Sequence, residues 1–332
     1  MKLILPALLF ILISSCNSAT STKTDQTDST GKKIEVENVQ KNNFDTALYL
    51  MQLKHISNGD TSGRWPVTVH YPLAGAIFPT HRVVAYYGNL YSKKMGILGE
   101  LPKEEMLKKL MGEVESWQKA DSVLKVIPAL HYVAVTAQAG GEKKRMRMPF
   151  HQIDTILSWA KEINALTFVD IQVGWSKLEE EIPALEKYLS MPDVHLGIDP
   201  EFSMKFGDVP GKRIGTFDAK DINYAINYLA SIVKKYNLPP KILVVHRFTQ
   251  GMVTNYKDIK IVPEVQVVMD MDGWGNKTLK RSTWLRYIFK EPVEFTGFKI
   301  FYKNDLKNDP KILYTPEELI KFTPQPVYIQ YQ

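Results

Sequence analysis

Apolar runs of strand length recur eight times along this chain, at residues 83–87, 126–132, 167–172, 194–199, 242–246, 265–270, 298–302 and 327–331. Each run is almost continuously apolar, as is typical of a parallel strand buried on both faces. Between most of them apolar residues recur about every 3.6 positions, which predicts helices at 101–120, 151–164, 178–190, 218–236, 278–289 and 315–322. The connection at 250–263 shows no convincing helical period.

Strand and helix alternate eight times, which predicts a parallel sheet with right-handed crossovers, and eight strands close a barrel. We therefore expect one α/β domain over residues 44–332, a (β/α)8 barrel of the TIM type. The chain ends directly after the eighth strand, where such a barrel has its last helix. Because residues 44–56 also have helical spacing, we expect this N-terminal helix to replace the last one.

A short apolar run at residues 3–13 follows Met1 and Lys2. It is shorter than the roughly 20 residues of a spanning helix and has the layout of a signal peptide. Residues 13–16, Ile-Ser-Ser-Cys, resemble the lipobox of bacterial lipoproteins, whose cysteine is acylated after cleavage. The resemblance implies a signal peptide at 1–15, lipidation (palmitate) of Cys16, and a lipoprotein bound to a membrane of the bacterial cell envelope. Which membrane and which face carry it stay open.

Residues 16–43 are rich in Ser, Thr, Asp, Lys and Asn and almost free of large apolar side chains. Such a segment buries too little surface to fold, so we expect a disordered tether. A flexible chain of this length has an r.m.s. span of roughly 30 Å.

Composition and charge narrow the classes of function. The 332 residues are 44% hydrophobic and 23% charged, which is ordinary for a globular protein. The net charge is +6, but acids interleave with the Lys and Arg residues, so we expect no nucleic-acid partner. The chain has no glycine-rich phosphate loop, Gly-x-Ser-x-Gly elbow or dinucleotide fingerprint, and we expect no organic cofactor. Cys16 is the only cysteine, which excludes a disulfide within the chain and a cysteine metal site.

Carboxylates stand at the ends of three predicted strands. The candidate catalytic residues are Asp170, Asp199, Glu201, Asp270 and Asp272. Because the carboxyl ends of barrel strands face the active-site mouth, we expect these side chains to share one opening. Asp270 and Asp272 precede Gly273, so a role in a turn is the structural alternative for them.

Other polar and aromatic residues follow the same strands and are candidates for substrate binding. They are Tyr86, Tyr87, His131, Gln172, Trp175, His246, Trp274, Lys299 and Tyr302. Acids beside flat rings fit a sugar site, because two acids can divide the acid and base roles while rings face the sugar. The structural alternatives are hydrogen-bonded core histidines and aromatic rings that pack under loops.

Asp199 and Glu201 are two residues apart, so their side chains point the same way if the strand geometry persists. Pro200 lies between them and cannot donate to a sheet, so we expect the strand to end near Asp199 and Glu201 to open a loop. The structural alternative is that Asp199 caps the next element and Glu201 is solvated.

Several stretches resemble a family of uncharacterised secreted or lipid-anchored bacterial proteins with barrel-like sequences: 86–88, 96–100, 170–172, 199–202, 244–252 and 297–302. That family brings no settled activity. Residues 197–201, Gly-Ile-Asp-Pro-Glu, are similar to the fourth-strand signature of chitinase-like glycosidases. This resemblance implies Glu201 as the general acid and Asp199 as its partner. The signature has further acids upstream and an apolar residue between its last two acids, where this chain has Gly197 and Pro200.

Three functions remain open. In the first, a hydrolase acts on a carbohydrate or cell-envelope glycan, with Glu201 as proton donor, Asp199 as orienter and Asp170, Asp270 or Asp272 as second carboxylate or stabiliser. In the second, the same acids and the strand-end histidines bind a divalent metal ion for hydrolysis, although no His-Glu-x-x-His spacing is present. In the third, a glycan-binding lipoprotein uses the same pocket without catalysis.

Overall fold

The computed structural model describes residues 44–332 except residue 68. The predicted signal peptide at 1–15, the lipidation of Cys16 and the tether at 16–43 lie outside the described residues. In the part of the chain that the structure describes, no helix is long and apolar enough to cross a bilayer.

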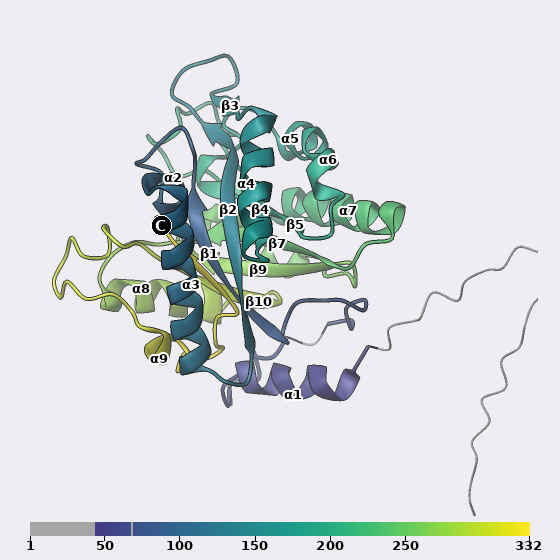
Figure 1. The fold of residues 1–332 in the computed structure, drawn as a ribbon. Helices are drawn as coiled ribbons and strands as arrows, with labels where there is room; N and C mark the ends of the chain where they lie inside the picture. The colour runs from purple at the N-terminus through teal and green to yellow at the C-terminus, as the bar shows by residue number, and fades with distance from the viewer. Residues whose placement is uncertain (1–43, 68) are drawn as a thin grey trace, which may run out of the picture. The chain divides into compact units, whose positions relative to one another are not determined.

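Eight parallel strands form a closed barrel, which confirms the predicted fold (Figure 1). They are β1 (His81–Gly88), β2 (Lys125–Ala137), β4 (Leu166–Ile171), β5 (Val194–Ile198), β7 (Lys241–Arg247), β9 (Val265–Met271), β10 (Phe295–Ile300) and β11 (Tyr328–Tyr331). Each strand pairs in parallel with the next, and β1 pairs with both β11 and β2, which closes the ring. All eight predicted strands therefore belong to one sheet.

Helices and short strands fill the connections. The helices are α1 (Thr46–Ile56), α2 (Ile97–Glu100), α3 (Lys103–Ala120), α4 (Phe150–Glu162), α5 (Leu178–Ala184), α6 (Glu186–Leu189), α7 (Ala219–Tyr236), α8 (Lys277–Thr283) and α9 (Pro316–Leu319). A π-helical turn, η4 (Trp284–Phe289), continues α8, and β3 (Arg145–Arg147) pairs antiparallel to β2. A separate two-stranded sheet joins β6 (Phe217–Asp218) to β8 (Val253–Thr254). The connection at 250–263 has only the 3-10 turns η2 (Gln250–Met252) and η3 (Tyr256–Asp258) around β8.

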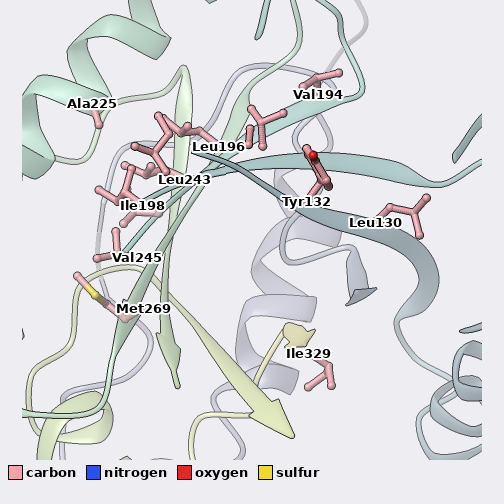
Figure 2. Close-up of a cluster of buried hydrophobic side chains, with 14 of the residues drawn as sticks. Leu130, Tyr132, Val194, Leu196, Ile198, Ala225, Leu243, Val245, Met269 and Ile329 are labelled. Atoms are coloured by element: carbon pink, nitrogen blue, oxygen red, sulfur yellow. The ribbon is translucent and has the colours of Figure 1, made fainter. Parts of the chain in front are cut away.

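Alternate residues of each strand point outward and pack against the helices. Figure 2 shows part of this outer core, in which Leu196 and Ile198 of β5 lie near Leu243 and Val245 of β7 and Ala225 of α7. The helix α7 presents such an apolar face along its whole length and begins at a capping box formed by Asp218 and Asp221.

The barrel interior has two parts. Its amino-terminal part is a second apolar cluster that includes Val83, Ala85, Phe168 and Val244. Ile56 of α1 joins this cluster, so α1 packs against the amino-terminal end of the barrel. The other part of the interior, toward the carboxyl ends of the strands, is polar and forms the candidate site.

The position of α1 differs from the expected one on the outer wall. His55 of α1 contacts Asp121 before β2, and Gln325 before β11 donates its backbone N–H to the Ile56 carbonyl. These partners precede strands and lie at the amino-terminal end. The outer faces of β1 and β11 are instead covered by α3, where Trp117 Nε1 donates to the Tyr331 hydroxyl.

Candidate active site

A cavity of about 650 Å³ lies at the carboxyl ends of the barrel strands. It falls in the size range of small-ligand pockets. Its lining includes Tyr87, Lys94, Met95, Ala137, Gln172, Asp199, Glu201, Phe202, Phe248, Asp272, Gly273, Trp274, Leu279, Thr283, Lys299, Phe301, Asn304 and Gln332. Acids, neutral amides and aromatic rings from several strands thus share one opening, as the strand ends predict.

Asp199 and Glu201 reach the cavity through a single 3-10 turn, η1 (Pro200–Phe202). The strand β5 ends at Ile198, and Asp199 caps the turn by accepting a hydrogen bond from the Glu201 backbone N–H at 3.0 Å. Pro200 starts the turn, where its missing N–H costs nothing. The Asp199 side chain therefore caps η1 and also lines the cavity. Its capping role does not exclude a role in the site.

Glu201 is the acid whose environment favours the protonated form. Burial raises the pKa of Glu201 to about 7, and the negative charge of Asp272 adds to the rise. Lys299 and His246 pull the pKa in the other direction without reversing it. Near neutral pH the Glu201 carboxyl group is therefore a source of a proton inside the cavity.

The environment of Asp272 favours the ionised form of its carboxyl group. Its Oδ1 lies 3.0 Å from Lys299 Nζ, and its Oδ2 lies 3.1 Å from His246 Nδ1. Burial alone would raise the pKa of Asp272, but the charges of Lys299 and His246 outweigh burial and lower the pKa. Glu201 therefore ionises at a higher pH than Asp272 in the same cavity.

Asp199, like Glu201, is an acid whose environment favours the protonated form. Its Oδ2 accepts a 3.4 Å hydrogen bond from Gln172 Nε2, which also reaches the Tyr87 hydroxyl at 3.4 Å. Burial raises the pKa of Asp199 well above the ordinary value, and nearby carboxylates, among them Glu201, add to the rise. A protonated Asp199 can donate a hydrogen bond to a ligand in the cavity.

A buried polar layer lies below the lining residues. His131 Nε2 and His246 Nε2 both lie 2.8 Å from the same atom, Asp170 Oδ2, and all three side chains have no exposed surface. His131 Nδ1 lies 2.6 Å from the hydroxyl of Tyr328. Asp270 is also fully buried, with its Oδ2 3.4 Å from His246 Nδ1. These residues face the interior but do not line the cavity.

Two glycines make room for this layer. A Cβ atom on Gly197 would lie 2.6 Å from His131 Nε2, and a Cβ on Gly297 would lie 2.6 Å from Asp270 Oδ1. Both distances are far below van der Waals contact. The imidazole and the carboxylate therefore occupy space that only a glycine leaves free, on β5 for His131 and on β10 for Asp270.

The trio His131, Asp170 and His246 offers one ligand atom each within 4.8 Å of one another, which is close enough to hold a metal ion. A carboxylate oxygen only accepts hydrogen bonds, so both Nε2 atoms that contact Asp170 Oδ2 carry protons. A metal ion would have to displace both protons and both hydrogen bonds. The trio fits a charged hydrogen-bond network better than a metal centre.

Three predicted binding residues lie elsewhere. Tyr86 points outward, where its hydroxyl lies 3.0 Å from that of Tyr302. Tyr302 in turn donates to Glu113 of α3 at 2.6 Å. Trp175 is 44% exposed and donates to the Asp208 carbonyl, away from the lining residues. The sequence correctly identifies the strand ends that border the cavity. It does not show which of the side chains at each strand end point into the cavity.

The loop that carries Trp274 is anchored from below. Asp305 accepts hydrogen bonds from the Gly275 and Phe301 backbone N–H groups at 2.9 Å each and pairs with Lys280 at 2.7 Å. These contacts are buried and place the Trp274 ring at the cavity rim. Nothing in the sequence pattern around Asp305 marks it as part of the site.

Several lining residues were not predicted. Phe301 and Gln332 stand at the ends of predicted strands seven and eight, so the rule that found Lys299 could have found them. Lys94, Phe248, Asn304 and Thr283 come from loops or a helix, and only the folded chain brings them to the cavity; the other unpredicted lining residues are Met95, Ala137, Phe202, Gly273 and Leu279.

Comparisons with known proteins give distant similarity. No protein-family model matches the chain, and no curated protein matches it. Similar solved structures include the cellulase Cel5C_n (TM-score 0.40, 15% identity, 66% of this chain and 65% of that chain) and mannanase man26 of Bacillus subtilis (0.39, 10%, 88% and 86%). Another is a dihydropteroate synthase of Coxiella burnetii in complex with pteroic acid (0.33, 10%, 76% and 88%). This chain thus spans 65% of the length of the cellulase.

Proposed function

We propose that this protein is a hydrolase of glycosidic bonds that uses Glu201 as its proton donor. The observation that carries the proposal is the division of roles between two carboxyl groups in one cavity. The pKa of Glu201 is raised to about 7, mainly by burial, whereas Lys299 and His246 lower the pKa of Asp272 against its burial. Two titratable groups whose environments push their pKa values apart are the signature of an acid and a base at work.

The reaction follows from this division. Glu201 transfers its proton to the glycosidic oxygen as the bond from that oxygen to the sugar carbon breaks, and the leaving sugar departs as an alcohol. The ionised Asp272 stabilises the positive charge that develops on the sugar ring. Water supplies the hydroxyl group of the new reducing end, and its remaining proton returns Glu201 to the acid form. Asp199 holds the Glu201 backbone through the 3.0 Å hydrogen bond and so orients the donor.

The remaining lining supports a sugar as the substrate. The lining contains the aromatic rings of Tyr87, Phe202, Phe248, Trp274 and Phe301. The amides of Gln172, Asn304 and Gln332 offer both donors and acceptors to sugar hydroxyl groups. Rings and neutral amides together match the two faces of a carbohydrate, which presents C–H groups on one side and hydroxyl groups at its edge.

We infer that the protein works while attached to a membrane of the bacterial cell envelope. The lipobox-like residues 13–16 and the polar segment 16–43 support this inference. A cell-envelope glycan or another extracytoplasmic carbohydrate would then be within reach. Mass spectrometry of the purified N-terminal peptide tests the anchor: an acylated Cys16 is expected, and an unmodified Met1 would contradict it.

The experiment that tests the hydrolase is a screen of polysaccharides and peptidoglycan fragments for release of reducing ends. The wild-type protein is compared with Glu201→Gln and with a control, Glu104→Gln, in which an exposed acid on α3 is neutralised. We expect wild type and control to cleave the same glycan and the Glu201 variant to lose activity by at least about 10²-fold. Retained activity in Glu201→Gln would remove Glu201 from this role.

The same screen separates catalysis from binding alone. Calorimetry with the Glu201→Gln variant should show that it still binds the glycan that the wild type cleaves, because the amide keeps the shape of the carboxyl group. Saturable binding by the wild type without release of reducing ends would instead identify a glycan-binding protein and contradict the hydrolase proposal.

A further inference from the structure

His246 occupies a position below the cavity that the proposed reaction does not use. It stands at the end of β7, has no exposed surface, and lies between two carboxyl groups. Its Nε2 is 2.8 Å from Asp170 Oδ2 and its Nδ1 is 3.1 Å from Asp272 Oδ2. Of these neighbours only Asp272 lines the cavity.

The geometry favours a doubly protonated ring. An ionised carboxylate accepts hydrogen bonds and donates none, so the His246 Nε2 atom that bonds to Asp170 Oδ2 carries a proton. His246 Nδ1 makes no hydrogen bond with the described residues, but it lies 3.1 Å from Asp272 Oδ2 and 3.4 Å from Asp270 Oδ2, and carboxyl groups this close to the ring favour its imidazolium form. Burial alone would lower the pKa of His246, but the charge and hydrogen bond of Asp170, with Asp270 and Asp272, outweigh it and raise the pKa well above the ordinary value.

His131 can be compared directly with His246. It contacts the same oxygen of Asp170 at the same 2.8 Å and is equally buried. Its other nitrogen, however, faces the hydroxyl of Tyr328, which can donate, so a single ring proton satisfies both contacts. Burial lowers the pKa of His131 to about 4, and the ring is neutral at physiological pH. Two histidines on one carboxylate thus differ in charge.

We propose that the His246 imidazolium is a positioning residue that fixes the Asp272 carboxylate beside Lys299 and keeps it ionised, so that Glu201 and not Asp272 carries the proton that the reaction uses. This inference rests on the proposed function, because it explains how the acid and base roles are kept apart. The charged and titratable groups that surround His246 are Asp170, Asp270, Asp272, His131 and Tyr87, with Lys299, Asp199 and Glu201 beyond them.

The positive charge of His246 lowers the pKa of both Glu201 and Asp272. Removing it must move both ionisations to higher pH. The neutral His131 exerts no such effect, although it makes the same bond. The pair therefore offers a comparison in which burial and the 2.8 Å contact with Asp170 are equal, while the charge of the ring and the neighbour of Nδ1 differ.

The experiment compares the pH dependence of kcat/KM for wild type, His246→Gln and His131→Gln. For His246→Gln we expect both limbs to move to higher pH, each by about one pH unit, the size of shift that loss of an opposite charge nearby produces. For His131→Gln we expect both limbs to stay in place even if the variant is less stable. An unshifted His246→Gln profile, or an equal shift in both variants, would overturn the proposal.

A second measurement needs neither a substrate nor a folded His246 variant. In ¹⁵N-histidine NMR of the wild-type protein, assigned with His131→Gln, we expect the His246 ring to carry two protons at pH 7.5 and the His131 ring to carry one. A neutral His246 would overturn the proposal whether or not any glycan is cleaved. A doubly protonated His246 in a protein that cleaves nothing would instead count against the proposed function alone.

Discussion

Replacing Glu201 with Gln should make the protein more stable at alkaline pH. The folded protein holds the Glu201 pKa at about 7, against an ordinary value of 4.5, mainly because burial penalises the charged form. A group whose pKa is raised by folding adds stability below its unfolded pKa, and this stability is lost as the pH rises through the folded pKa. The wild-type fold therefore loses free energy between about pH 4.5 and pH 7, and the neutral glutamine does not.

The size of the effect follows from the pKa. One unit of pKa corresponds to about 1.4 kcal/mol, so full ionisation of Glu201 costs the fold up to roughly 3 kcal/mol. For a domain of this size such a difference moves the melting temperature by several degrees. The burial that keeps Glu201 protonated near neutral pH therefore lowers the stability of the fold at alkaline pH.

Urea denaturation at pH 4.5, 6 and 8 measures this effect. We expect the free energies of unfolding of wild type and Glu201→Gln to be similar at pH 4.5 and to diverge by about 2–3 kcal/mol at pH 8, with the variant more stable. The exposed Glu104→Gln control should follow the wild type at every pH. Parallel curves for wild type and Glu201→Gln would refute the reasoning that burial keeps Glu201 protonated.

Three further predictions concern the layers beneath the cavity. Asp272→Asn should destabilise the protein by about 3 kcal/mol or more in chemical denaturation, because Lys299 and His246 lose their shared counter-charge; a loss within a few tenths of a kcal/mol would contradict the buried pairing. Gly197→Ala should cost about 1–3 kcal/mol because its Cβ would lie 2.6 Å from His131 Nε2, whereas Gly112→Ala, in open space on α3, should not destabilise; equal stabilities would refute the close contact. Deleting residues up to 57 should lower the melting temperature, since it removes Ile56 from the interior cluster; an unchanged value would show that α1 contributes nothing to the barrel.

The barrel could be predicted because each strand is buried on both faces. Runs such as 242–246 are apolar on both sides of the strand, and their alternation with helical segments leaves few topologies. The position of α1 could not be predicted in the same way. Its apolar face fits either the outer wall or the end of the barrel, and only contacts such as His55 with Asp121 distinguish the two.

The sequence predicts which strand ends carry the site residues, but not how their side chains are arranged in space. Tyr86 and Tyr87 are adjacent, but successive strand residues point to opposite faces, so Tyr87 lines the cavity and Tyr86 packs outward. Trp175 and Trp274 both follow a glycine after a strand, yet only the Trp274 loop is anchored at the cavity. The contact of His131 and His246 with a single oxygen of Asp170 depends on the stagger of three strands, which no local pattern encodes.

The pH dependence of kcat/KM on a cleaved glycan tests most directly whether Glu201 is the proton donor. Because the donor must be protonated and its pKa lies at about 7, we expect activity to fall tenfold for each pH unit above that value. A rate that stays constant from about pH 5 to pH 9 would contradict the assignment, since no group with the pKa of Glu201 would then control the reaction.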